Sequence, residues 1–317
     1  VAEEFANGYV AGTGIDALLP VVDKLGGQGL SLALTYLPDP DDEAEAVDRL
    51  AESLGRLGDA AAGIELSVKP SQLRLAADPA GARARLAGLC EEAGRAGAVV
   101  TLEMQGASCF DNTVGLWRAV RADHPDLGLT LPADVFASER VVGPLADDGA
   151  RLRLCIGAYP APRTLGYRRE QDKAKALVRC LRSAMERGGY AMVASHDPTI
   201  ISIAQELARR NDIEPDGYEH QMFYGVRPLE QRRLVDIGHR CRTYVPFGPA
   251  WYEYLTAQIW PGPWSIEHTA EEKIETQLFD GDQAGLDKAV AWLHERYTAE
   301  ADRWTDIPSI LDCEPDR

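Results

Sequence analysis

Polar and aromatic side chains gather where several short apolar segments of this chain end. Residues 219–228 read EHQMFYGVRP and residues 244–254 read YVPFGPAWYEY, and each segment would join a strand to a loop and then to a helix. A cation placed there can stabilise negative charge that develops in a reaction, and aromatic rings can exclude water. Further candidates follow the other expected strands: Lys69, Glu103, Gln105, Asp134, Arg153, Gly157, Ala158, Tyr159, His196 and Asp197.

Other kinds of site are less well supported by the residue spacing. Glu103, Asp134 and His196 could form a metal site, but the chain has no H-x-H or H-x-x-x-H ligand pair, so we expect no metal. Asp197 before Pro198 is also typical of a helix N-cap beside a buried histidine. The sequence lacks a G-x-S-x-G elbow, a Walker motif and a G-x-G-x-x-G after a strand. A nucleotide cofactor would therefore have to be held in another way.

Short apolar runs alternate with longer amphipathic stretches along most of the chain. The runs predict strands at 30–35, 63–68, 99–104, 127–131, 152–156 and 190–194, followed by the two C-terminal segments. The stretches predict helices at 43–56, 80–96, 113–122, 138–146, 170–187 and 199–210, with one more after each of the last two strands. Continuous apolar strands alternating with helices favour a parallel sheet covered on both sides, and eight units favour a closed (β/α)8, TIM-type barrel.

The ends of the chain are expected to lie outside the barrel. Residues 1–28 are predicted to form an N-terminal helical extension, residues 29–262 the barrel, and residues 263–317 a C-terminal helical tail. The tail contains a predicted helix at about 284–303, in which Leu286, Val290, Leu293 and Tyr297 recur near helical spacing.

Composition excludes several functions and favours a cytoplasmic protein. The chain has 317 residues, 45% hydrophobic and 26% charged, and its net charge of −17 argues against nucleic acid as a partner. Six scattered cysteines without a C-x-x-C motif predict reduced thiols. No apolar run approaches a transmembrane length, and the first ten residues do not resemble a signal peptide.

Several motifs occur in an order and spacing that resemble those of the proline dehydrogenase family of flavoenzymes. The resemblance runs from Leu30 to about Ile259 and includes the two C-terminal segments. SVKPSQL at 67–73 resembles the family's S-[IV]-K-x-[ST]-x-L, and LEM at 102–104 resembles the start of L-D-M-E-D. LRLCIGAY at 152–159 resembles L-R-L-V-K-G-A-Y, and ASHDP at 194–198 resembles A-T-H-[DN].

The resemblance implies an FAD site at the mouth of the barrel and removal of a hydride from a carbon next to an amine nitrogen. It places Arg153 near the flavin N5, where a cation would stabilise the reduced, anionic flavin. It implies that the cofactor is lined by Gly157, Ala158, Ser195, His196, Glu219 and Gln221. It implies that the substrate is lined by Lys69, Glu103, Tyr159 and Tyr254, of which Lys69, Glu103 and Tyr254 would act with Arg153 in catalysis.

The departures from the family concern mainly the substrate carboxylate. The family carries an Arg-Arg pair on its last helix, and this chain has Ala257-Gln258 at those substrate positions. Each charge-assisted hydrogen bond contributes roughly 1.5–3 kcal/mol, so losing both should weaken binding of a free amino acid by roughly two to four orders of magnitude. The family's L-G-E reads Leu37-Pro38-Asp39 here, its strand-five Lys is Ile156, and its strand-four Gln is Pro132.

The sequence therefore predicts an FAD-dependent amine dehydrogenase or oxidase whose substrate is not free L-proline. That substrate would be an amine without a carboxylate, an amino acid tethered to a carrier protein, or a hydrazine-like compound, and quinone or oxygen would accept the electrons. One alternative is an L-proline dehydrogenase with a relocated carboxylate clamp at Arg163, Arg168 or Arg169. The others are a non-catalytic barrel scaffold that has lost its flavin and a metal-assisted hydrolase.

Overall fold

The computed structural model describes residues 9–39, 42–43, 45–159, 161–250, 257–259, 275–277 and 283–299. Its chain forms two compact units, one comprising Gly8–Pro249 and the other Val1–Asn7 with Ala250–Arg317. The first unit holds the barrel and all described candidate residues except those near position 257. The domain boundaries expected near residues 28 and 262 stay predictions.

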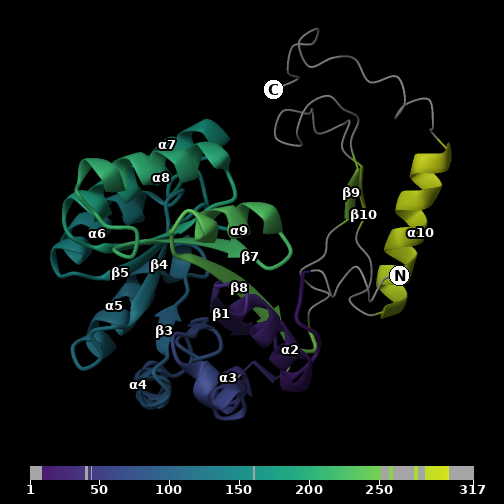
Figure 1. Ribbon diagram of the computed structural model, residues 1–317, viewed down its shortest axis with the longest axis horizontal. Helices are drawn as coiled ribbons and strands as arrows, with labels where there is room; N and C mark the ends of the chain where they lie inside the picture. Colours follow the sequence, from purple (N-terminus) through teal and green to yellow (C-terminus); the bar gives the residue numbers. More distant parts are fainter. Residues whose placement is uncertain are drawn as a thin grey trace, which may run out of the picture. The chain divides into compact units, whose positions relative to one another are not determined.

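Eight parallel strands close into a barrel, which confirms the predicted fold class (Figure 1). Each strand pairs with the next along the chain, and the first strand also pairs with the eighth, with Ser31 opposite Arg242 and Tyr36 opposite Phe247. The strands are β1 (Ser31–Tyr36), β2 (Glu65–Val68), β3 (Val99–Leu102), β4 (Gly128–Pro132), β5 (Arg151–Cys155), β6 (Tyr190–Ala194), β7 (Glu219–Phe223) and β8 (Cys241–Phe247).

Helices surround the strands and follow the predicted order from β1 to β7 (Figure 1). Asp78 caps the helix after β2 and Asp197 caps the helix after β6, and in both a proline occupies the first turn. This confirms the N-cap interpretation of the Asp197-Pro198 pair. The helices are α2 (Ile15–Gly26), α3 (Glu45–Leu57), α4 (Pro79–Arg95), α5 (Phe110–Arg121), α6 (Phe136–Asp147), α7 (Glu170–Glu186), α8 (Pro198–Arg210) and α9 (Pro228–Asp236), with short 3-10 turns η2 (Gly58–Ala61) and η3 (Ala107–Cys109).

The strands separate an apolar shell from a polar interior. Residues such as Leu66, Leu129 and Leu152 are fully buried and belong to the hydrophobic core shared with the helices. The neighbouring strand residues instead contact strands that are not adjacent in the sheet, as Arg153 of β5 does with Glu65 of β2. Such contacts are possible only through the lumen, so alternation along each strand sends leucines outward and charged groups inward. Barrel interiors are more often filled by branched apolar residues.

The prediction of a helix after β8 is wrong for residues 257–259. These residues form strand β9 (Ala257–Ile259), which pairs antiparallel with β10 (Glu275–Gln277). The segment is flanked by Pro249 and Pro261, and a proline removes a backbone donor and restricts the preceding residue. Pairing with β10 gives the extended backbone its hydrogen bonds.

The C-terminal unit also contains a helix where one was expected. This helix, α10 (Gln283–Ala299), lies where a helix was predicted at about 284–303, and residues 300–303 lie outside the described residues. Arg296 of α10 forms an ion pair with Glu275 of β10 at 3.2 Å, which joins the helix to the two-stranded sheet.

Candidate active site

A buried set of charged and polar side chains fills the lumen; we refer to it as the lumen cluster. Arg153 lies at its centre, with its Nε donating to Gln221 Oε1 at 2.6 Å and Nη1 to Ser67 Oγ at 2.6 Å. Its Nη2 donates to Glu65, which has no solvent exposure. The cluster consists of Glu65, Ser67, Glu103, Arg151, Arg153, Glu219, Gln221, Arg242 and Tyr244.

Glu103 lies at the upper end of the lumen cluster, towards the carboxyl ends of the strands. Its Oε1 accepts hydrogen bonds from Tyr244 at 2.6 Å and Ser67 at 2.7 Å, and it lies 3.6 Å from Arg153 Nη1. The Arg153 guanidinium also lies over the Tyr244 ring, with Cζ 5.4 Å from its centroid. Burial alone would lower the pKa of Arg153, but the Glu65 and Glu103 carboxylates raise it above its ordinary value. The cation is therefore retained in the lumen.

Glu219 occupies the lower part of the lumen cluster. It forms a two-point ion pair with Arg242, at 2.7 and 3.0 Å, and accepts a hydrogen bond from Gln221 Nε2 at 2.6 Å. Tyr190 also donates to Glu219, at 3.2 Å, and burial followed by this carboxylate raises the pKa of Tyr190 to about 12. Glu219 is fully buried and holds the Gln221 amide by this hydrogen bond, and its place in the lining of the cofactor stays a prediction.

Exposed apolar and aromatic side chains stand at the mouth above the lumen cluster. Ile156, Tyr159 and Phe223 are 38%, 43% and 48% exposed, although they follow or end buried strands. Phe223 stacks on His196 with ring centroids 5.3 Å apart and meets Tyr244 edge to face at 5.4 Å. Tyr244 thus contacts both Phe223 and the buried Arg153 cation, and exposed apolar side chains next to a cation suit a planar ligand acquiring negative charge.

His196 is fixed at the mouth as a neutral hydrogen-bond acceptor. Its Nε2 accepts from the backbone N–H of Phe223 at 3.0 Å, and its backbone carbonyl accepts from Arg227. Burial, followed by the Arg227 charge, lowers the pKa of His196 below its ordinary value. The neighbouring Ser195 Oγ accepts from the N–H of Asp197 at 3.2 Å, which holds the turn after β6.

The loop after β5 approaches β4 closely at Gly157. Its N–H donates to Asp134 Oδ1 at 2.6 Å, and a Cβ added here would lie 2.9 Å from Pro132 Cβ. Across the mouth, Ser71 N donates to Gln105 Oε1 at 2.7 Å, and Lys69 N donates to Gln72 Oε1 at 2.9 Å. These bonds fix the backbone on both sides of the opening.

The structure brings together part of the predicted site. Arg153, Glu103 and Gln221 meet in the lumen cluster, whereas Gly157, Ala158, Tyr159, Ser195, His196 and Lys69 lie at strand ends around the mouth. Tyr254 lies outside the described residues. Ala257 and Gln258 are described only as backbone of β9. The roles assigned to all these residues stay predictions.

Several residues of the site were missed by reasoning from the sequence, notably Glu65, Arg242 and Phe223. One signal was available, because Glu65 and Arg242 are the charged residues of strands that are otherwise uncharged. A charge buried in such a strand requires an opposite charge, so each one indicates a partner in the lumen. Phe223 carries no comparable signal, since an aromatic residue at a strand end is usually part of the core.

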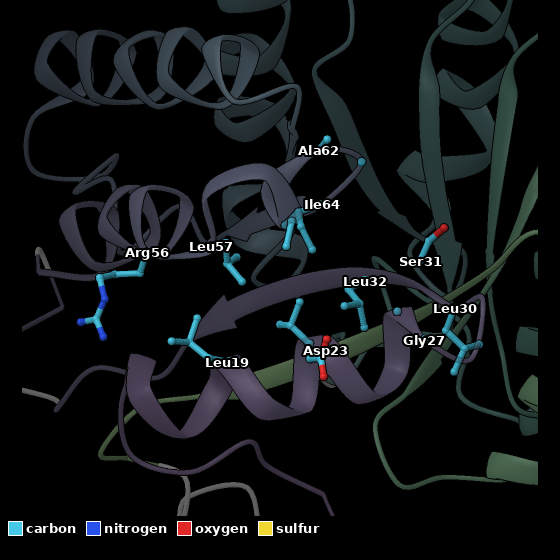
Figure 2. Close-up of a pocket in the computed structure, with 14 residues that line it drawn as sticks. Leu19, Asp23, Gly27, Leu30, Ser31, Leu32, Arg56, Leu57, Ala62 and Ile64 are labelled. Carbon is cyan, nitrogen blue, oxygen red and sulfur yellow. The ribbon is translucent and has the colours of Figure 1, made fainter.

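A cavity of about 430 Å³, separate from the mouth, lies between α2, β1 and the segment 56–64. Figure 2 shows Leu19 and Asp23 of α2 on one side of it and Leu32, Leu57 and Ile64 on the other. Ser31, the first residue of β1, also lines it, so the cavity is at the amino-terminal end of the strands. Active sites of such barrels lie at the opposite end, which favours the mouth as the functional site.

The described residues also bear on other kinds of function. They contain no group of three or more His, Cys, Asp or Glu placed to hold a metal ion. Among the helices that the structure describes, none is both long and apolar enough to span a membrane. The described cysteines are free thiols, and burial raises the pKa of Cys90, Cys180 and Cys241 to about 12.

The fold and the mouth define the chain as a (β/α)8 barrel with charged groups in its lumen and aromatic side chains at the carboxyl ends of its strands. Proline dehydrogenase 1 of Bacillus subtilis is 26% identical over 258 residues, covering 80% of this chain and 85% of that protein. Proline dehydrogenase of Deinococcus radiodurans is 28% identical over 265 residues, covering 80% of this chain and 85% of that protein. The chain is thus similar to proline dehydrogenases over most of its length, in agreement with the resemblance that its motifs indicated.

Solved structures share the barrel fold. Proline utilization A from Bdellovibrio bacteriovorus superposes with a TM-score of 0.70 at 19% identity, covering 78% of this chain and 31% of that one. Proline utilization A from Corynebacterium freiburgense gives 0.67 at 16% identity, covering 96% and 32%. The chain thus spans about a third of the length of those proteins. No family model matches it.

Proposed function

We propose that this protein is an FAD-dependent oxidoreductase that removes a hydride from the carbon next to an amine nitrogen. The observation that carries the proposal is the buried Arg153 cation beneath the exposed rim of Ile156, Tyr159 and Phe223. The family relationship supports an enzyme acting on a C–N bond, since its curated relatives are proline dehydrogenases. Quinone or oxygen would accept the electrons, and a cytoplasmic location is part of the proposal.

The residues at the mouth fit a flavin. The rim offers exposed apolar side chains, the backbone at Gly157 lies close to Pro132 and Asp134, and Arg153 supplies a buried cation. Arg153, Gly157 and Ala158 would contact the ring system, while Ser195, His196 and Gln221 would line the remainder of the cofactor site. When bound, FAD supplies the acceptor for a hydride, and a fixed cation lowers the free energy of the negative charge that follows.

The substrate side is proposed to lie between the cofactor and Glu103. Glu103 accepts the hydrogen bonds of Ser67 and Tyr244 on Oε1, and we assign its Oε2 to an N–H of the substrate amine. Lys69 and Tyr159 would border the same space. As the carbon gives up a hydride with its two electrons, the nitrogen loses a proton to water or a nearby base, and the product is an imine. The aromatic rim would exclude water during the transfer.

We further propose that the preferred substrate is not free L-proline. The support is the sequence alone: Ala257-Gln258 brings no cation to the positions where the family holds the substrate carboxylate. An amine without a carboxylate, a carrier-tethered amino acid or a hydrazine-like compound would not need that clamp.

An L-proline dehydrogenase with a relocated clamp is the second candidate, and the names of the curated relatives favour it. Arg163, Arg168 and Arg169 are exposed in the loop after β5, and Arg168 Nη1 donates to Ala161 O at 3.1 Å. This loop could present a cation to a carboxylate. A scaffold that no longer binds flavin is the third candidate.

The deciding experiment is the visible absorbance spectrum of the purified, FAD-supplied protein under anaerobic titration. L-proline, its methyl ester, secondary amines without a carboxylate, and alkylhydrazines are added in turn. Bleaching by the ester or the amines at concentrations at least about 100-fold below that needed for L-proline supports the proposal. Preferential bleaching by L-proline favours the relocated clamp, and failure to bind FAD overturns the enzyme assignment.

A matched variant pair sharpens the choice of substrate. Ala257→Arg with Gln258→Arg should increase L-proline turnover if the missing arginines alone set the specificity. Arg163→Gln, Arg168→Gln and Arg169→Gln, made singly, should leave L-proline turnover unchanged unless one of them is the relocated clamp.

A further inference from the structure

Glu65 is shared by two arginines that lie on the same strand. Its Oε1 accepts from Arg153, and its Oε2 lies 3.2 Å from Arg151 Nη2. Gln221 Nε2 lies 3.5 Å from Oε1 as well. Burial alone would raise the pKa of Glu65, but Arg153, followed by the other arginines, brings it below the ordinary value. The carboxylate is therefore an anion in the middle of the barrel.

The charges of the lumen cluster are balanced but not evenly shared. Within the described part of the chain, the cluster holds three arginines and three glutamates: Arg151, Arg153, Arg242, Glu65, Glu103 and Glu219. Glu219 and Arg242 form a closed two-point pair. Glu65 instead divides its charge between Arg153, which also lies near Glu103, and Arg151, which lies two residues earlier on β5.

We propose that Glu65 is a positioning residue that holds Arg153 below the mouth and sets how much of its positive charge reaches the bound cofactor. Charges interact strongly in a buried lumen because little water screens them. Glu65 would therefore lower the reduction potential of the flavin, and Arg151 would oppose it by drawing on the same carboxylate. This inference rests on the proposed flavin function.

The test measures the reduction potential of the bound flavin by equilibration with reference dyes in the wild-type protein, Glu65→Gln and Arg151→Gln. Glu65→Gln should favour the reduced flavin at least tenfold, which is about 30 mV for two electrons. Arg151→Gln should shift the potential in the opposite direction. A general loss of packing or stability would not shift the flavin potential in opposite directions in these two variants.

A matched control separates the position of Glu65 from a general effect of charge. Glu219→Gln removes an equally buried carboxylate whose partner is Arg242. Its shift should be clearly smaller than that of Glu65→Gln. A shift of less than about twofold in Glu65→Gln, or an equal shift in Glu219→Gln, would overturn the proposal. If Glu65→Gln does not fold, the flavin potential of Arg151→Gln decides the question. A potential equal to or above that of the wild-type protein contradicts the proposal.

A second measurement does not need the cofactor. The denaturation midpoints of Glu65→Gln, Arg153→Gln and the double variant form a cycle in flavin-free protein. The double variant should be more stable than the sum of the single losses predicts, because neither charge is then left unpaired. Additive losses would show that Glu65 does not hold Arg153. Wild-type protein that binds no FAD would overturn the proposed function, while this cycle would still decide whether Glu65 holds Arg153.

Discussion

Polar side chains on the two faces of β7 lie in contrasting environments. Gln221 points into the lumen, where its amide bonds both to Arg153 and to Glu219. His220, the preceding residue, points into the shell between strands and helices, where neither ring nitrogen has a hydrogen-bond partner within the described structure. The lumen is thus built to keep charge, whereas the shell keeps a titratable ring neutral. Variants on each face should therefore fail for different reasons.

The largest effect is expected from removing the central cation of the lumen. Arg153→Gln leaves Glu65 and Glu103 without their shared partner, and breaking a buried pair in this way costs about 3–5 kcal/mol of stability. Turnover should fall by at least about 100-fold, since charge stabilisation at the reacting centre is lost. Urea denaturation and single-turnover flavin reduction measure the two effects. Near-normal flavin reduction would show that Arg153 is only structural.

The shell side of β7 should make the protein sensitive to acid. Burial, followed by the nearby His239, lowers the pKa of His220 from 6.5 to about 4. The folded state binds this proton less readily than the unfolded state, so the stability it contributes is complete above pH 6.5 and declines as pH falls towards 4. The loss is on the order of 3 kcal/mol.

Comparing His220→Phe with the wild-type protein isolates that contribution. The urea midpoint of the wild type should fall more steeply between neutral pH and about pH 5 than that of the variant. Glu230, Arg233 and His239 also face this ring and are retained in both proteins. Parallel pH profiles would contradict the assignment to His220.

A smaller effect is expected where the backbone closes over the mouth. Gly157→Ala would place a Cβ 2.9 Å from Pro132 Cβ and 3.0 Å from Asp134 Oδ1. Overpacking of this kind costs about 1–3 kcal/mol, and movement of the loop should weaken FAD binding. Fluorescence titration with FAD measures the affinity, and Gly115→Ala, where no atom lies near the added Cβ, serves as the control. Equal affinities in the two variants would show that the approach at Gly157 is not needed.

The smallest change in stability is expected at the rim. Phe223 is 48% exposed, so Phe223→Ala should cost less than about 1 kcal/mol. The same change removes the stacking partner of His196 and the edge contact with Tyr244, so cofactor or substrate affinity should fall while the fold is retained. Leu229→Ala changes another exposed apolar residue as a control. If both variants lose affinity equally, the rim has no special role.

The alternation of strands and helices could be predicted from the sequence, because strands and helices differ in their hydrophobic period. The predicted strand at 190–194 and the capped helix that follows it lie where the structure places them. Strand ends also indicated the ring of candidate residues, since all eight ends of a parallel barrel meet on one side. The prediction from the sequence is wrong after β8, because the pairing of 257–259 with 275–277 depends on a partner distant in the chain.

Which charges meet in the lumen follows from closure of the barrel and not from any local pattern in the sequence. Arg153 and Glu65 are separated by 88 residues, and no local pattern links a buried Glu on one strand to an Arg three strands away. Closure of the barrel brings them together, and burial then makes their pairing obligatory, because an isolated charge in the lumen would cost far more than the pair. The family motifs could name Arg153, but the position of Glu65 between two arginines exists only in the closed barrel.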